Sequence, residues 1–297
     1  MTVTTEQPAV DLREPGGWRR TKDRAATTLM WTAFVVTVVP LGFVLYTVIQ
    51  KGASAISPNF LTKEPIPPNV LPVTVGGMAP AIVGTIIITA LAAVMAIPLG
   101  VLGAVYLSEY GGNRWLARVI AFMSDVMTGV PSIVMGLFIY SIWVLRFGYS
   151  GLAGSFALGA LMLPIVIRSS YEMLRLVPDP LREASYALGA TKARVTLTVA
   201  LPAALGGIVS GSLLAVARAA GETAPVLFVI FTAYNTNWNV FHGTNTTLAT
   251  QIFADAQQVF PGSQARAWGA ALTLIAITFI LMIAARIVTA RFTRYIR

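Results

Sequence analysis

Long apolar runs separated by short polar segments dominate the hydrophobic pattern of this chain. The runs cover about 25–50, 79–107, 119–145, a fourth that ends near 171, 203–233 and 267–287. About 20 apolar residues cross the ~30 Å hydrocarbon core of a bilayer, so each run is long enough to span it as a helix. The pattern therefore predicts an all-α integral membrane protein with six transmembrane helices.

The polar segments between the runs divide the chain into regions. Residues 1–24 are expected to form a loose tail, and residues 25–76 to form the first transmembrane helix, bent at Pro40, with an outer loop. Residues 77–297 are expected to form the main transmembrane domain, with a polar outer loop over 234–266. The first outer loop cannot be one long helix, because it contains Pro58, Pro65, Pro67, Pro68 and Pro72.

Composition and charge agree with a membrane protein. Hydrophobic residues make up 56% of the 297 positions and charged residues 11%, whereas a soluble domain has about 25% charged residues. The net charge of +9 comes from cations at the ends of apolar runs, which argues against nucleic-acid binding. Fifteen of the 21 Lys and Arg fall on segments expected inside and four on segments expected outside. The positive-inside rule then places both termini in the cytoplasm.

Several kinds of chemistry are missing from the sequence. The absence of cysteine excludes disulfides and thiol chemistry. The only histidine, His242, falls in an expected outer loop, so we expect it to be solvated and predict no metal site. A G-x-x-x-x-G-K-[ST] loop is absent, so ATP cannot bind through a Walker A site in this chain. We predict no cofactor.

The stretch 182–202 is one of the few polar islands and has readable helix signals. Asp179 can cap a helix, Pro180 fits its first position, and Glu183 lies in the first turn, where the helix dipole favours an anion. Gly189 is suited to a left-handed turn at the helix end, and Thr191 can cap a second segment. A basic cytoplasmic surface is expected from Arg175, Arg182, Lys192 and Arg194.

The same stretch resembles the EAA loop of ABC importer permeases. The resemblance rests on the spacing of Glu183-Ala184, Gly189 and Leu201-Pro202 within about 173–202, while Ser185 and Val199 depart from the usual residues. In that family the loop forms a coupling helix that docks into a groove of a cytoplasmic ATPase. An ordinary amphipathic loop helix is the alternative.

Two further runs narrow the resemblance to PstA-type permease subunits of phosphate ABC importers. They are Asp-Val-Met-Thr-Gly-Val-Pro-Ser-Ile-Val-Met-Gly over 125–136 and Arg-Ala-Ala-Gly-Glu-Thr-Ala-Pro over 218–225. The resemblance implies a type I ABC importer permease fold in the bacterial cytoplasmic (inner) membrane, with no enzymatic activity of its own. It also implies as partners a PstC-like second permease, a PstB-like ATP-binding subunit dimer and a PstS-like extracytoplasmic phosphate-binding protein.

Two charged residues fall inside the fifth apolar run. Arg218 follows Ala203 by 15 residues, which at ~1.5 Å per residue puts it roughly 22 Å deep, past the midplane of a ~30 Å core. A charge there normally faces the interior of a helix bundle or a water-filled path. On a helical wheel Arg218 shares one arc with Gly207, Gly211, Ala215, Glu222 and Pro225.

Two interpretations of these charges remain open. In the structural one, Arg218 and Glu222 are four residues apart on a helix and only neutralise each other. In the functional one, which we favour, Arg218 offers positive charge to an oxyanion and Glu222 holds its geometry. Arg168 either extends to the headgroups or lines the substrate pathway. Asp125 is expected to be structural, near the cytoplasmic start of the third span.

The resemblance predicts a permease that moves inorganic phosphate by alternating access, driven by a partner ATPase. A permease for another oxyanion, such as sulfate or molybdate, is the nearest alternative. An ion-coupled secondary transporter with Glu222 as proton carrier is a third possibility, and a membrane scaffold without transport is a fourth. The EAA loop argues against a secondary transporter, which has no ATPase to dock.

Overall fold

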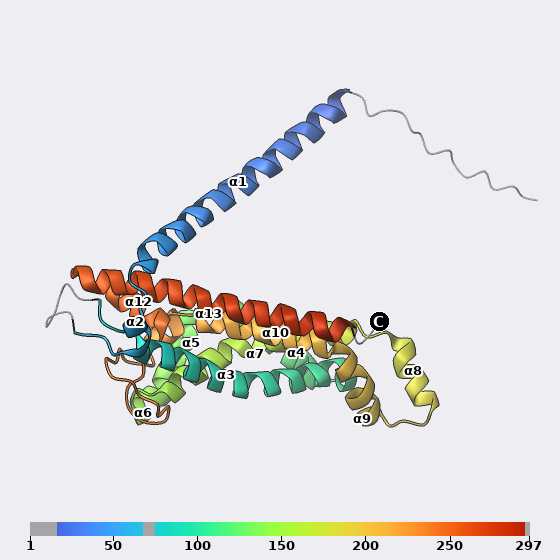
Figure 1. The fold of residues 1–297 in the computed structure, drawn as a ribbon. Helices are drawn as coiled ribbons and strands as arrows, with labels where there is room; N and C mark the ends of the chain where they lie inside the picture. Colours follow the sequence, from blue (N-terminus) through green and yellow to red (C-terminus); the bar gives the residue numbers. More distant parts are fainter. Residues whose placement is uncertain (1–16, 68–74, 295–297) are drawn as a thin grey trace, which may run out of the picture. The chain divides into compact units, whose positions relative to one another are not determined.

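The computed structural model describes residues 17–67 and 75–294, and all of the regular structure among them is helical (Figure 1). Residues 1–16, 68–74 and 295–297 lie outside the described residues, and with them most of the expected tail, Pro68, Pro72 and Arg297. The contacts divide the chain into two units, Met1–Thr47 and Val48–Arg297, which we describe separately.

Helix α1 (Gly17–Ala53) forms the described part of the first unit and ends in the second. It starts inside the expected loose tail, so that expectation is wrong for residues 17–24, which form its first turns. Pro40 lies within the helix, which continues through it. Only 6% of its most apolar window is buried, so α1 presents apolar surface to lipid or to another chain.

Four long helices form the body of the second unit, with α7 against both α3 and α10. Glycines allow this close packing: a Cβ atom built at Gly100 would lie 2.7 Å from Val166, and one at Gly211 would lie 2.5 Å from Ser169. The four helices are α3 (Ala79–Val105), α7 (Gly151–Arg175), α10 (Leu201–Ala220) and α13 (Pro261–Arg294). Helices α3, α7 and α10 share a core that contains Ile88, Ala92, Leu158, Met162, Val166 and Ala215.

The third apolar run is broken in two, so the expectation of one continuous helix over 119–145 is wrong. Helix α4 (Trp115–Gly129) and the following helical stretch, Ser132–Phe147, meet at an angle of 106°. That stretch consists of α5 (Ser132–Ile139), the π-helical segment η2 (Tyr140–Val144) and α6 (Leu145–Phe147). Pro131 explains the break, since a proline removes a helix hydrogen bond and disfavours the helical conformation of the residue before it.

The fifth apolar run begins earlier and ends earlier than expected. A continuous helical segment runs from Lys192 to Ala220 through α9 (Lys192–Val195), the π-helical η3 (Thr196–Ala200) and α10. After Gly221 the chain forms only the short α11 (Ala224–Leu227), so 203–233 is not one helix. The described residues hold five helices of membrane-spanning length and hydropathy, or six if the bent pair is one span.

The segment 234–266 contains more structure than the expected polar loop. Helix α12 (Leu248–Ala256) begins at Thr247 with a capping box in which Thr250 takes part. The backbone amide of Leu248 donates to Thr85 Oγ1 of α3 at 2.8 Å. Next to it, the short α2 (Pro58–Thr62) buries Phe60 in a small core with Met78, Ala81, Leu248 and Ala270.

The EAA-like loop is a helix, a glycine turn and a second helix, as expected. Helix α8 (Asp179–Ala187) begins one residue earlier than expected, because Pro178 and not Asp179 occupies the N-cap position. Gly189 has φ +80°, and the amides of Gly189 and Ala190 donate back to the carbonyls of Tyr186 and Ser185. This Schellman motif requires a left-handed residue, which explains the glycine. Thr191 caps α9 by accepting from the amide of Arg194.

Candidate functional site

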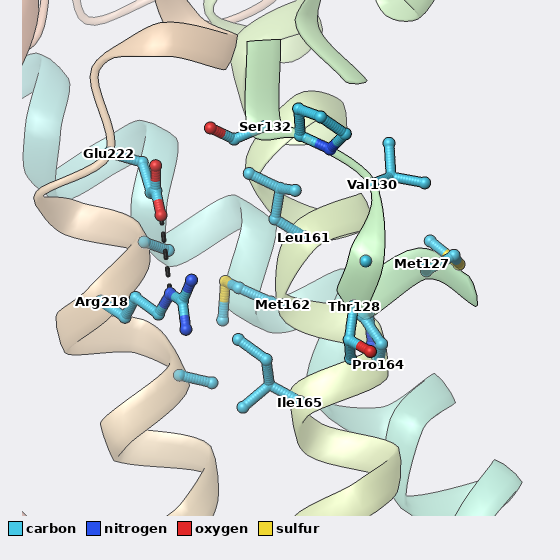
Figure 2. A pocket seen from close by; sticks show the side chains of 14 residues that line it. Met127, Thr128, Val130, Ser132, Leu161, Met162, Pro164, Ile165, Arg218 and Glu222 are labelled. Carbon is cyan, nitrogen blue, oxygen red and sulfur yellow. Dashed lines mark ion pairs between the residues drawn. The ribbon is translucent and has the colours of Figure 1, made fainter. Parts of the chain in front are cut away.

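A cavity of about 360 Å³ lies where the two interrupted segments meet α7 (Figure 2). Its walls come from the α4–α5 break at 127–132, from 161–165 of α7, and from the end of α10 with Glu222. Residues 161–165 lie near the middle of α7, so the cavity lies near half the length of a helix long enough to span the membrane. Interrupted helices at mid-membrane depth form the substrate sites of many transporters.

Arg218 and Glu222 form a loose ion pair on one wall of this cavity. Arg218 Nε lies 3.5 Å from Glu222 Oε1, and the two side chains are 69% and 22% exposed. The pairing of the two residues is as expected. Their placement on one continuous helix is wrong, because α10 ends at Ala220 and Glu222 belongs to the turn that follows.

The small-residue face of α10 positions Arg218. Gly207 and Gly211 pack against Met173 and Ser169 of α7, so the two helices run close together up to the cavity. Ala215 and Arg218 then line the cavity, while Pro225 lies beyond it, packed against Gly136 of α5. Three of the positions predicted to share a face with Arg218 therefore do so on α10, and Pro225 lies past the end of the helix.

The opposite wall offers groups that can bind an anion. Thr128 and Ser132 line the cavity. The Thr128 hydroxyl donates to the carbonyl of Asp125 at 2.6 Å, whereas Figure 2 shows the Ser132 hydroxyl directed toward the side of Glu222. Ser132 begins α5, where the first N–H groups of a helix lack acceptors within the helix and the dipole favours negative charge. Together with Arg218, the Ser132 hydroxyl and these N–H groups suit a small oxyanion, which Glu222 repels.

Arg168 lies away from Arg218 and has its own partners. Its Nη1 donates to Asp125 Oδ1 of α4 at 2.8 Å, and its Nε lies 3.6 Å from Glu172. Arg168 and Asp125 line a second cavity of about 210 Å³ with Arg118 and Tyr171. Asp125 lies in the second half of α4, so its expected position near a helix N-terminus is wrong and its partner is Arg168.

The residues of the EAA resemblance do not share one surface. Glu183 and Ala184 are exposed on α8, and Gly189 is exposed at the turn. Leu201 packs against the core formed by Ala104, Leu174 and Ala204, and the exposed Pro202 follows it. The first three are thus available to a partner, whereas Leu201 fixes the start of α10 inside this chain.

The sequence analysis did not predict three features of the structure, namely one helix break and two ion pairs. The α4–α5 break had a local signal, Gly129 followed by Pro131. Arg182 was expected on a basic surface, but it is only 13% exposed and pairs with Glu109. Arg266 was expected in an exposed outer loop, but it is 1% exposed and paired with Asp255. No local signal in the sequence connects these last two pairs.

No group of three or more His, Asp or Glu side chains in the described residues could hold a metal ion.

Comparisons of this sequence with known proteins all point to membrane permeases of binding-protein-dependent transport systems. The family model for "binding-protein-dependent transport system inner membrane component" matches residues 96–294. The phosphate transport system permease protein PstA 1 of Mycobacterium tuberculosis is 44% identical over 273 residues, covering 91% of this chain and 89% of the relative. The corresponding PstA protein of Yersinia pestis is 40% identical over 285 residues, covering 94% of each chain.

Solved structures show the same fold at low sequence identity. A chain of the inward-facing MetNI methionine ABC transporter matches with a TM-score of 0.58 and 19% identity, covering 76% of this chain and 99% of that one. A chain of a bacterial alginate ABC transporter matches with a TM-score of 0.61 and 12% identity, covering 92% and 97%.

Proposed function

The chain belongs to the binding-protein-dependent transport system inner membrane components, and within them to the PstA-type phosphate transport permeases, and from this we propose how it works. It is a multi-pass permease subunit of an ATP-driven importer that moves inorganic phosphate across the bacterial cytoplasmic membrane by alternating access. Sulfate, molybdate and ion-coupled transport receive no support from the relatives.

The observation that carries the proposal is the open pair of Arg218 and Glu222 on the cavity wall. Arg218 is 69% exposed and is engaged, among the described residues, only through Nε at 3.5 Å. The remaining guanidinium donors can therefore bind two oxygens of a phosphate, the geometry that arginine offers best. Glu222 holds the arginine and repels a permanently bound anion, so phosphate binds transiently.

We propose that Ser132 and the first amides of α5 complete the anion site. Phosphate binding at a helix N-terminus follows from the unpaired N–H groups and the dipole of the helix. The cavity with Arg168 lies on the same pair of helices, α4 and α7, as the main cavity. Arg168 then guides the anion along this side of α7 after it leaves Arg218.

The proposed partners supply the energy and the substrate. Helix α8, with Glu183 and Ala184 exposed, docks on a PstB-like ATP-binding subunit, of which a dimer hydrolyses ATP. A PstC-like second permease completes the pathway, and a PstS-like extracytoplasmic protein delivers phosphate. Co-purification from the native membrane would test this set, and the absence of an ATP-binding subunit from the complex would contradict it.

The proposed domain organisation and topology follow the same scheme. The tail, the first helix with its outer loop, and the permease domain from residue 77 form three regions, with both termini in the cytoplasm. Reporter fusions after residues 60, 148 and 250 should report outside, and fusions after 20, 112, 190 and 297 should report inside. An inside signal at 250 would contradict this topology.

The test of the proposed site is phosphate uptake by Arg218→Gln, Glu222→Gln and the double variant, with membrane abundance measured in parallel. We expect Arg218→Gln to assemble and to be inactive, because the donors for phosphate are lost. If the pair were only structural, the double variant would regain uptake, since removing both charges leaves none unpaired. Restored uptake in the double variant would therefore refute the anion-binding role.

A further inference from the structure

We propose that Arg182 and Glu109 form a positioning strut that ties α8 to the ends of α3 and α7. Through this strut a displacement of α8 reaches α7, which lines the phosphate cavity. The inference rests on the proposed function, because it assumes that an ATPase moves α8. Neither residue touches phosphate, so both act by holding α8 in place.

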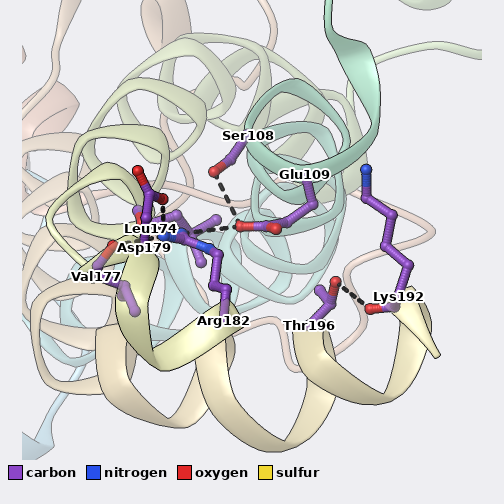
Figure 3. A network of polar contacts seen from close by, with 8 residues as sticks. All are labelled: Ser108, Glu109, Leu174, Val177, Asp179, Arg182, Lys192 and Thr196. Atoms are coloured by element: carbon purple, nitrogen blue, oxygen red, sulfur yellow. Dashed lines mark hydrogen bonds and ion pairs between the residues drawn. The ribbon is translucent and has the colours of Figure 1, made fainter. Parts of the chain in front are cut away.

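One guanidinium connects three elements (Figure 3). Arg182 Nη2 lies 3.1 Å from Glu109 Oε1 in η1 (Tyr106–Gly111), the π-helical segment that continues α3. The same nitrogen donates to the carbonyl of Leu174 at 2.8 Å, and Nη1 donates to the carbonyl of Val177. These carbonyls lie at the end of α7, where a cation is favoured by the helix dipole.

The side chains of the strut are more enclosed than the other side chains of α8. Arg182 is 13% exposed and Glu109 is 5% exposed, whereas α8 contains no fully buried residue. Its large apolar side chains Leu181 and Tyr186 are 50% and 41% exposed, and Leu188, directly after the helix, is 90% exposed. Helix α8 therefore has little apolar packing to hold it, and the side chain of Arg182 is its main anchor to the transmembrane helices.

A second contact reinforces the same junction from the other helix of the loop. The ammonium of Lys192, at the start of α9, lies 5.2 Å from the ring centre of Tyr110, the residue after Glu109. Both helices of the loop thus attach to η1. Wide π-helical turns are frequent at functional sites, and η1 presents Glu109 and Tyr110 in succession to the two loop helices.

Of the helices at this junction, α7 leads directly to the cavity. Helix α7 runs without interruption from the cavity residues 161–165 to Arg175, next to the Leu174 carbonyl that Arg182 contacts. Helix α3 packs along α7. A movement of α8 that the strut transmits therefore shifts one wall of the cavity. Without the strut, α8 moves and the loop deforms, but α7 stays in place.

The test uses the assembled four-subunit transporter in proteoliposomes, with phosphate as substrate. The variants are Arg182→Gln, Glu109→Gln and the double neutral variant, and Arg175→Gln serves as the control because Arg175 is an exposed cation of the same loop. The double variant is the decisive one, since it leaves no unpaired buried charge. Phosphate moved per ATP hydrolysed, bound ATPase and amide hydrogen exchange over 179–188 are measured for each.

We expect the double variant to retain its ATPase and hydrolyse ATP, to move about tenfold less phosphate per ATP, and to exchange its α8 amides faster. Arg175→Gln should match the wild type. An unchanged phosphate-to-ATP ratio in the double variant would overturn the inference. Failure of the double variant to assemble would also overturn it, because the pair would then stabilise the fold.

The proposed function and the strut fail in different ways. If the wild-type complex moves no phosphate, the proposed function is wrong, and the exchange of α8 still tests the strut. If the wild type moves phosphate and the double variant keeps both its transport ratio and its slow α8 exchange, only the strut is wrong.

Discussion

Two arginine–carboxylate pairs in this protein have opposite geometries. Arg266 binds Asp255 through Nε and Nη2, both at 2.7 Å, and donates through Nη1 to the carbonyls of Ile66 and Val75. Both side chains are almost fully buried, at 1% and 3% exposed. The pair of Arg218 and Glu222 is a single contact at 3.5 Å with the arginine 69% exposed.

The difference separates a structural arginine from one that is available to a ligand. In the α12–α13 pair, protein acceptors satisfy the guanidinium, and the arginine links α12, α13 and the chain on both sides of 68–74. In the cavity pair most donors remain free for a solute. Arginine alone does not indicate function, and the number of donors left unsatisfied distinguishes the two sites.

The largest expected effect is the loss of stability when the buried pair of Arg266 and Asp255 is disrupted. Arg266→Gln leaves Asp255 as an uncompensated buried charge, which costs roughly 3–5 kcal/mol of stability. We expect little folded protein in the membrane, measured as abundance and as the unfolding temperature in detergent. The Asp255→Asn, Arg266→Gln double variant should recover part of it. If Arg266→Gln were as abundant as the wild type, Arg266 would not be a structural arginine and the distinction between the two pairs would be wrong.

The same conservative change should then affect different properties at the two sites. Lysine keeps the charge but loses the planar fork of donors. We expect Arg266→Lys to lower stability by about 1–3 kcal/mol with residual uptake in proportion to abundance. Arg218→Lys should leave abundance unchanged and reduce phosphate uptake about tenfold. Equal losses of abundance in the two variants would show that both arginines are structural.

A substitution at Gly189 of the EAA-like loop tests whether transport can fail while both arginine–carboxylate pairs remain intact. Gly189→Val places a β-branched residue at φ +80°, which costs about 1–2 kcal/mol through backbone strain. A Cβ atom at this position would have no neighbour within 4 Å, so the expected defect comes from backbone strain and not from a clash of the Cβ atom. We expect ATP hydrolysis without matching uptake.

Gly189→Asn is the matched control, because asparagine tolerates the left-handed conformation. It should transport close to the wild-type rate. Normal uptake and assembly in Gly189→Val would contradict the assignment of α8 as the coupling helix.

The smallest effect on stability is expected at Arg168. Its contact with Asp125 joins two side chains that are each 61% exposed, and such pairs contribute about 0–1 kcal/mol. Arg168→Gln should therefore assemble normally, and its uptake should fall because the second cavity loses a cation. Uptake equal to that of the wild type at normal abundance would remove Arg168 from the pathway.

Much of the fold could be predicted from local sequence. The lengths of the apolar runs predicted six spans, and the described residues contain five helices of spanning length plus the bent pair. Thr191 marked a helix start through its capping side chain, and Gly189 marked a helix end through its left-handed backbone. The pairing of Arg218 with Glu222 also followed from their spacing. These features depend on residues within a few positions of one another, which a sequence shows directly.

The breaks in the helices were only partly predictable. Pro131 carries a local signal against a continuous helix, and the sharp bend of 106° agrees with it. The end of α10 at Ala220 has a weaker signal, Gly221 followed four residues later by Pro225. Apolar runs alone cannot reveal such breaks, because an interrupted segment inside a protein cavity is as apolar as a continuous helix.

Local sequence was enough to predict a helical membrane protein with an EAA-like loop and two charges within an apolar run. Only the tertiary structure decided which charges meet: Arg266 with Asp255, Arg182 with Glu109, and Arg168 with Asp125. The last two pairs join residues 73 and 43 positions apart. The free energy of a charge depends on its burial and its partners, and both depend on helices that are distant in the sequence but packed together in the fold.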